Sequence, residues 1–169
     1  DVFIGHLADA MASRQPWVES HLGRYADYQD HPFRALNTAF MEDGGAVWLG
    51  PGRTLDGAVG LVFLAPSGHG ANYIQHPRTL VVVGAGSSLT LVEAYAGSAE
   101  NAYCNNAVTE VVLEEDAVLD HYRLLRGGIQ AFHIGTVQVR QSRNSRYRSH
   151  SLTSGGAIAR VEINSLLDG

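Results

Sequence analysis

The chain has 169 residues, of which 45% are hydrophobic, 17% are charged and 19 are Gly. This length fills about one domain, and low charge with many Gly residues is typical of a turn-rich β protein. There is no Lys, which excludes Schiff-base catalysis and a P-loop, and the single cysteine, Cys104, excludes an intrachain disulfide framework.

The charge is unevenly distributed along the chain. Residues 1–120 contain 15 acidic residues and 5 Arg, whereas residues 121–169 contain 2 acidic residues and 7 Arg. No apolar run approaches the ~20 residues of a membrane-spanning helix, and the N-terminus lacks the features of a signal peptide. We therefore expect a cytoplasmic protein. Because the chain starts without Met and stops at Gly169 within a strand pattern, we interpret it as part of a longer protein.

The beginning of the chain is predicted to be helical. Phe3, Leu7 and Met11 recur at four-residue spacing, which predicts a helix with one apolar face. Pro16 opens a second short helix, and Gly23 is placed to end it.

A third predicted helix opens at Pro32. Leu36 and Phe40 lie on one face of it, and Gly44 and Gly45 are placed to stop it. Three helices this short are expected to pack on the structure that follows rather than to stand alone.

From Ala46 onwards the pattern changes to short apolar strands bounded by Gly, Pro and polar turns. The predicted strands are 46–49, 60–64, 79–83, 89–94, 109–114, 118–125, 131–140, 145–153 and 157–163, and 66–75 is predicted to be a loop. The strand at 118–125 is ambiguous, because neither its Val118 and Asp120 face nor its Leu119 and His121 face is cleanly apolar.

Three pieces of the second half resemble one another. Residues 83–93, 113–123 and 139–148 each contain a strand end, a small or polar turn and a new strand, at offsets of 30 and 26 residues. A unit that recurs every ~20–50 residues indicates stacked coils, so we predict a β-solenoid. Its open end would be a site for self-association. We divide the chain into a helical region at 1–45 and an incomplete solenoid core at 46–169.

Two motifs that suggest chemistry are better explained as turns. Gly84-Ala85-Gly86 follows an apolar strand, but a dinucleotide-binding motif needs Gly rather than Leu at position 89 and then a helix. Residues 114–116 are all acidic, but adjacent carboxylates in one turn point apart and do not face each other across a glycosidic bond.

The candidate metal ligands are few. His121, His133 and His150 fall on predicted strands, where stacking would bring them together as a metal site, although hydrogen-bonded structural histidines are the default for such positions. Cys104 alone cannot hold an iron–sulfur cluster, which needs about four ligands, but it could offer one thiolate to a site shared with a partner.

A basic stretch lies near the end of the chain, and it contains an aromatic residue. Its members are Arg140, Arg143, Arg146, Tyr147 and Arg148. Nucleic-acid binding is one interpretation of such a stretch. The other is a solvated face or pairing with acidic surface, for which the acid-rich first part of the chain is one source.

In their order along the chain, several segments resemble the SufB/SufD family of iron–sulfur cluster assembly proteins. They are 36–44, 76–84, 88–95, 106–113, 119–124, 132–136, 145–152 and 163–164. SufB-like chains tend to have Val-Glu-Gly-Cys where this chain has Val92-Glu93-Ala94-Tyr95, so Tyr95 favours the SufD branch and argues against a scaffold thiolate at that position.

The resemblance implies a right-handed parallel β-helix with flanking helices. It also implies pairing with a SufB-like paralogue and a SufC-like ATPase in a SufBCD complex that handles the iron–sulfur cluster. We place no catalytic, cofactor-binding or metal-binding residue of the family in this chain, because its functional positions would follow Gly169. We therefore expect a non-enzymatic scaffold subunit that binds no cofactor alone. The alternatives are a carbohydrate-active β-helix enzyme and an Arg-rich nucleic-acid-binding module.

Overall fold

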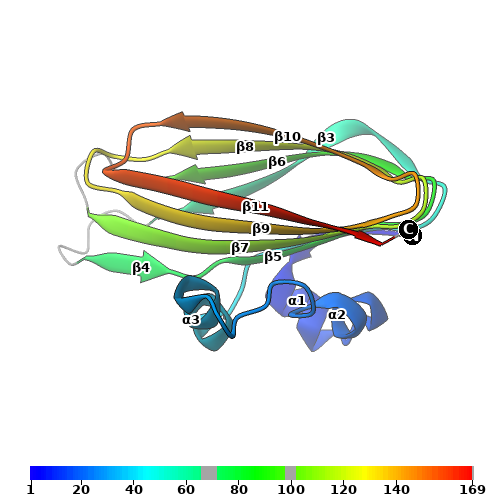
Figure 1. Cartoon of the computed structure of the whole chain (residues 1–169), viewed down its shortest axis with the longest axis horizontal. Coiled ribbons are helices and arrows are strands. Elements are labelled where there is room, and N and C mark those ends of the chain that lie inside the picture. The colour runs from blue at the N-terminus through cyan, green and yellow to red at the C-terminus, as the bar shows by residue number, and fades with distance from the viewer. Residues whose placement is uncertain (66–71, 98–101, 169) are drawn as a thin grey trace.

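The computed structural model describes residues 1–65, 72–97 and 102–168, and it shows an elongated rod of strands with helices along one side (Figure 1). The helices are α1 (Leu7–Ala12), α2 (Pro16–His21) and α3 (Pro32–Phe40). The strands are β1 (Val2–His6), β2 (Gly45–Leu49), β3 (Thr54–Leu64), β4 (Tyr73–Gln75), β5 (Arg78–Val83), β6 (Ser88–Ala96), β7 (Tyr103–Leu113), β8 (Val118–Arg126), β9 (Phe132–Ser142), β10 (Arg146–Ser154) and β11 (Ile158–Asp168).

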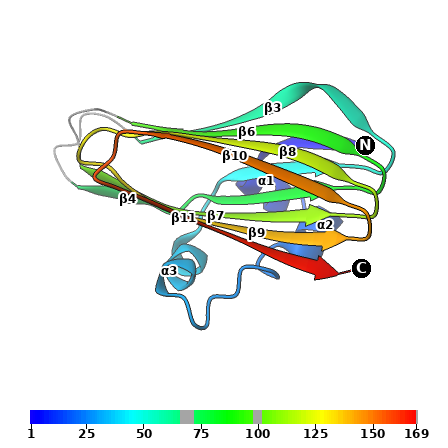
Figure 2. The same cartoon turned by 45° about the horizontal axis from the view of Figure 1, so that its top comes forward.

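The strands form two sheets, and successive coils of the chain alternate between them. The first sheet has the order β1-β2-β5-β7-β9-β11, with β4 beside β7, and the second sheet has the order β10-β8-β6-β3. Among the described residues, all strand pairs are parallel except β1 with β2. Parallel stacking of coils around one core is a β-helix, so the predicted solenoid is confirmed, and the helices cover the first sheet alone (Figure 2).

The stacking register confirms one predicted offset and corrects the other. Val83 pairs with Leu113, the predicted offset of 30 residues, but Leu113 pairs with Gln141, an offset of 28 rather than 26. The 26-residue offset occurs one coil later, where Phe132 pairs with Ile158. Coil length is set by the loops, which vary, whereas the strands must stay in register for their side chains to stack.

The space between the two sheets, which we call the lumen, is apolar at the end where the short turns join the strands. Its core there includes Val81, Val83, Leu89, Leu91, Val111, Leu113 and Leu119, all at most 1% exposed. The ambiguous strand at 118–125 is now resolved, because Leu119, His121 and Arg123 are buried while Tyr122 is exposed. The lumen therefore holds charged groups as well as apolar ones.

The N-terminal strand β1 corrects the prediction of a helix that contains Phe3. Val2–His6 is extended and pairs with β2. The apolar stripe is real, since Phe3 and Met11 pack on the same cluster and the Phe3 ring lies 5.6 Å from the ring of Trp17. A strand that runs into a helix satisfies the same spacing, and the β1–β2 ladder outweighs the weak helix propensity of this Val, Ile and Gly segment.

The second and third predicted helices are confirmed. As predicted, Gly23 lies just after α2 and has φ +73°, the left-handed conformation that ends helices. Gly44 does not stop α3, which ends at Phe40. Glycine is needed at position 44 because the chain passes close to β5 there, and a Cβ at Gly44 would lie 1.8 Å from the Arg78 carbonyl oxygen. Tyr73–Gln75, predicted to be loop, is the short strand β4, because it can add to the edge of β7. Residues 66–71 of that loop lie outside the described residues.

Candidate functional site

A chain of buried hydrogen bonds crosses the lumen from one sheet to the other. His121 of β8 contacts Glu93 of β6 at 3.0 Å between Nε2 and Oε2, and its Nδ1 lies 2.9 Å from the hydroxyl of Tyr147 on β10. From the opposite sheet, the Thr109 hydroxyl donates to Oε1 of Glu93 at 3.0 Å. Four strands thus share one network. Glu93 and His121 are both 0% exposed.

The network favours an ionised Glu93. Burial acts to raise the pKa of this carboxyl, but the His121 side chain, the Thr109 hydroxyl and the nearby Arg123 outweigh burial and lower the pKa below its usual value. Both ring nitrogens of His121 are engaged, so neither is free to coordinate a metal while these hydrogen bonds are made. Chemically, the arrangement holds a proton between buried groups and ties the sheets together.

Two further side chains with basic groups, Arg123 and His133, are buried in the lumen beside this network. Arg123 is 4% exposed, donates from Nη2 to the Ser151 hydroxyl at 2.8 Å, and has no partner for its Nε among the described residues. His133 packs edge-on against Tyr95, with ring centroids 4.8 Å apart. Burial, with a smaller contribution from Arg123, lowers the pKa of His133 to about 4, so this histidine is neutral near pH 7.

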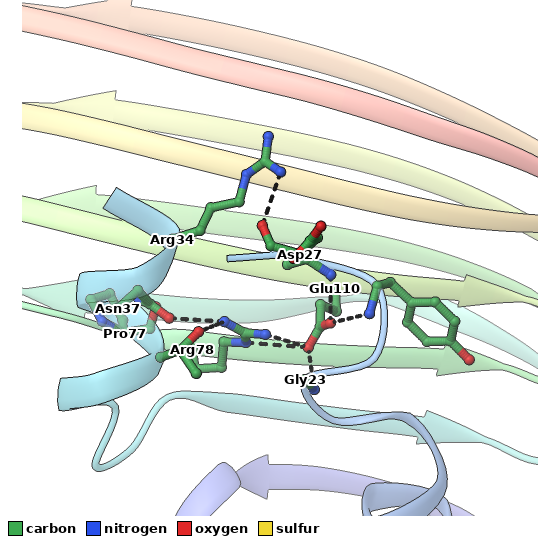
Figure 3. Close-up of polar contacts among 10 residues, drawn as sticks. Gly23, Asp27, Arg34, Asn37, Pro77, Arg78 and Glu110 are labelled. Atoms are coloured by element: carbon green, nitrogen blue, oxygen red, sulfur yellow. Dashed lines mark hydrogen bonds and ion pairs between the residues drawn. The ribbon is translucent and has the colours of Figure 1, made fainter. Parts of the chain in front are cut away.

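A second buried ion pair lies on the outer face of the first sheet, beneath the helical region (Figure 3). Oε2 of Glu110 accepts from Nη2 of Arg78 at 2.8 Å and from the Gly23 backbone N–H at 2.8 Å. Its Oε1 accepts from the N–H groups of Tyr25 and Ala26 at 2.9 and 3.0 Å. Glu110 therefore caps the backbone of the segment between α2 and α3 and neutralises a buried Arg. We call this contact the anchor.

Asn37 extends the anchor to α3. It is 0% exposed, its Nδ2 donates to the carbonyls of Pro77 and Asn106 at 3.0 and 2.9 Å, and its Oδ1 accepts from Nη1 of Arg78 at 3.1 Å. Asn106 in turn donates to the carbonyl of Phe33 at 2.8 Å. Through these contacts the helical region is fixed on β5 and β7.

The residues considered as metal ligands are not gathered together. His121 and His133 face the lumen from opposite sheets, whereas His150 stacks on Tyr122 outside the second sheet, with ring centroids 4.7 Å apart. Cys104 of β7 is partly buried, and burial raises the pKa of its thiol, which disfavours the thiolate. Within the ranges that the structure describes, no three His, Cys, Asp or Glu side chains form a group that could hold a metal ion.

The two suspected motifs are turns, as predicted. Gly86 has φ +65° and a strand follows it rather than a helix. Glu114 accepts from the N–H of Ala85 at 3.0 Å, so it links two stacked turns. Asp116 has φ +58°, in the left-handed conformation of a turn.

Three arginines of the basic stretch are paired with carboxylates, as one of the two interpretations predicted. Arg140 contacts Asp168 at 2.6 Å. Arg143 contacts Glu115, and Arg148 contacts Asp120 with Nη2–Oδ2 at 2.9 Å. These pairs join adjacent coils along the rod surface, so much of the positive charge is already neutralised within the chain.

Sequence reasoning missed the residues that carry both buried networks: Glu93, Arg123, Arg78 and Glu110. The available signal was a charged residue inside an otherwise apolar strand, as in the segments 88–96 and 103–113. Charged residues are almost never fully buried unless they are paired, so such interruptions point to a buried partner.

Two family models together match nearly the whole chain. The model described as "SUF system FeS cluster assembly, SufBD core domain" matches residues 66–169, and the "SufBD protein N-terminal region" matches residues 1–61. Among the described helices, none has the length and apolar character needed to cross a membrane.

Two curated relatives are similar to this chain. An iron–sulfur cluster assembly SufBD family protein of Synechocystis is 32% identical over 160 residues, which are 90% of this chain and 35% of that protein. The chloroplastic protein ABCI7 of Arabidopsis thaliana is 32% identical over 92 residues, which are 54% of this chain and 19% of that protein. The chain thus spans about a third or less of the length of these relatives. With its two matched regions and its parallel β-helix, the chain belongs to the SufBD family of iron–sulfur cluster assembly proteins.

Proposed function

We propose that this chain is part of a non-catalytic scaffold subunit of a Suf-type assembly complex, which pairs with a SufB-like paralogue and a SufC-like ATPase. The proposal extends the family membership to a particular role. ATP hydrolysis would belong to the ATPase partner, because this chain contains no Lys for a P-loop. The iron–sulfur cluster would be cargo of the complex, which we place in the cytoplasm.

The observation that carries the proposal is the environment of Tyr95. This residue is 4% exposed, its ring stacks on Phe63 at 4.8 Å and meets His133 edge-on. In the position where SufB-like chains tend to have a Cys, the chain therefore has a packed aromatic side chain. Burial also raises the pKa of Cys104, so the one thiol of the chain is a poor ligand. Both features favour a scaffold role over a cluster-binding role.

The nucleic-acid alternative is less favoured, because Arg140, Arg143 and Arg148 are already paired with carboxylates. Phosphate binding depends on uncompensated positive charge. No specific observation favours the carbohydrate-active alternative.

The test uses the natural protein that contains this chain, purified without oxygen, alone and with its candidate paralogue and ATPase. Iron and sulfide incorporation and ATP hydrolysis are measured in each mixture. The proposal predicts cluster formation and ATP turnover in the three-component mixture, neither activity in the natural protein alone, and no change in its Cys104→Ser variant. Cluster formation by the natural protein alone, or loss of cluster formation in the mixture with a folded Cys104→Ser variant, would contradict the scaffold role.

A further inference from the structure

A groove of about 1,040 Å³ opens beside the first coil of the stack, between β1 at the edge of the first sheet and β3 at the edge of the second. Its walls come from β1, α3, the segment 42–45, the second half of β3, and β4 with the two residues after it. In the part of the chain that the structure describes, β3 pairs with β6 on one side and has no strand on the other (Figure 2). Among the described residues, a row of backbone N–H and C=O groups without a strand partner therefore borders the groove.

The groove wall is apolar and well exposed. Ile4 is 49% exposed, Phe40 61%, Val62 64% and Leu64 67%. These are neighbouring residues on one concave surface rather than scattered apolar side chains, and contiguous patches of this kind mark interaction sites.

The edge of β3 lacks the features by which proteins protect a free strand edge. Its segment 60–64 reads Gly-Leu-Val-Phe-Leu and has neither a charge nor a Pro, and the register irregularity of β3 lies earlier, between Thr54 and Ala58. Charged residues, Pro and bulges are the usual means of blocking strand addition. By contrast, the edge strand β10 at the other end of the sheet carries Arg146 and Arg148. The unprotected half of β3 is the half that lines the groove.

The charge at the rim selects the partner. Glu42, Asp43 and His6 lie there, and the groove-lining residues that the structure describes include no Arg and no Lys. Asp43 is held in place, since its Oδ2 contacts His6 at 2.9 Å and its Oδ1 accepts from the Ala8 N–H at 3.0 Å. Burial acts to raise the pKa of Asp43, but hydrogen bonds from Ala8, Gly44 and His6 outweigh it and lower the pKa, so the rim stays negative.

We propose that this groove binds an extended apolar segment of a partner protein, which adds as a strand to the free edge of β3 and directs an Arg or Lys toward Glu42 and Asp43. Five residues of β3 line the groove, and at ~3.3 Å per residue a strand of about that length spans it. Backbone hydrogen bonds would supply affinity, and the apolar wall with its acidic rim would supply specificity. The inference rests on the geometry of the groove and is independent of the proposed scaffold role.

The probe is a fluorescent eight-residue peptide, Thr-Val-Arg-Val-Thr-Val-Arg-Val, titrated into the full chain and followed by fluorescence polarisation. We expect binding in the micromolar range, typical of small interfaces. We expect at least tenfold weaker binding when both Arg are replaced by Glu, and loss of binding when alternate peptide nitrogens are methylated. The methylated peptide keeps its side chains but cannot pair with β3.

Two variants of the chain form a matched pair. Ile4→Asp places a charge in the groove, and Ile158→Asp places the same charge on β11 at the opposite end of the same sheet, where Ile158 is 51% exposed against 49% for Ile4. Ile4→Asp should abolish binding, and Ile158→Asp should leave it unchanged, with equal unfolding midpoints for the two variants. Equal binding by the methylated peptide, equal effects of the two variants, or dimers of the chain that Ile4→Asp disperses would each overturn the proposal.

Discussion

Two buried carboxylates of this rod, Glu93 and Glu110, are both 0% exposed, yet they hold different parts of the molecule together. Glu93 faces the lumen and contacts the side chains of His121 and Thr109, so it ties sheet to sheet. Glu110 faces outward and contacts three backbone N–H groups and Arg78, so it ties the helical region to the rod. The partner of Glu93 is a histidine, a residue type that can lose its charge, whereas the partner of Glu110 is an arginine, which cannot. Breaking the anchor should therefore cost more than breaking the lumen network.

The largest effect is expected from Glu110→Ala. The change leaves the buried Arg78 without its carboxylate partner and removes the acceptor of three backbone N–H groups, so we expect the free energy of unfolding to fall by about 3–5 kcal/mol. Urea unfolding measures the loss, and hydrogen exchange should rise first at residues 23–26. The double variant Arg78→Met/Glu110→Leu is the control and should recover part of the loss. A smaller loss for Glu110→Ala than for Glu93→Ala would contradict the comparison.

A pH effect of about 3 kcal/mol is expected from His133. Its pKa is about 4 in the folded chain, below the ordinary 6.5. Between these values the unfolded chain binds a proton that the folded chain does not, so stability falls as the pH drops from 6.5 to 4. We expect His133→Gln to remove about that much of the fall in unfolding free energy measured between pH 7 and 4. A variant with the same pH profile as the natural chain would show that His133 is not neutral in the lumen.

A smaller effect, about 1 kcal/mol, is expected from Tyr147→Phe. The change removes one hydrogen bond to His121 and leaves the packing of the ring on the lumen core unchanged. Thermal unfolding measures it, and Tyr122→Phe is the matched control on the outer face, where no such effect is expected. A loss as large as that of Glu110→Ala would mean that the lumen network, not the anchor, dominates.

The smallest effect is expected from Arg143→Ala, which breaks the exposed pair with Glu115. Solvent and salt screen such a pair, so the melting temperature should not change measurably. A clear drop would show that the pairs between stacked turns hold the coils together, and the Arg148→Ala variant would then show whether the effect is general.

The repeating pattern was enough to predict the solenoid, because strands that must stack in register repeat their apolar positions and turns. The length of each coil was less predictable, since the stacked residues are 28 apart at Leu113 and Gln141 but 26 apart at Phe132 and Ile158. The first strand was missed because Phe3, Leu7 and Met11 satisfy a helical stripe whether Phe3 lies on a helix or on a strand that precedes one.

The candidate site was harder to predict than the fold. Tyr95 was singled out from the sequence, and it lies in the lumen beside His133. The partners of Glu110 could not be predicted, because it is 32 residues from Arg78 and 85 from Tyr25. The stacking of β5 on β7 brings Arg78 near it, and the packing of the helical region on the first sheet brings Tyr25. Long-range pairs of this kind depend on coil length, which was the least predictable quantity.

The central claim, that the chain belongs to a scaffold working with a paralogue and an ATPase, is tested most directly by affinity purification without oxygen. The natural protein that contains this chain is tagged and isolated from its source cells, and the bound proteins are identified by mass. The account predicts recovery of an ATPase together with a second β-helix protein. Repeated recovery of neither, from a tagged protein that is folded and supports cluster assembly in the cell, would contradict it.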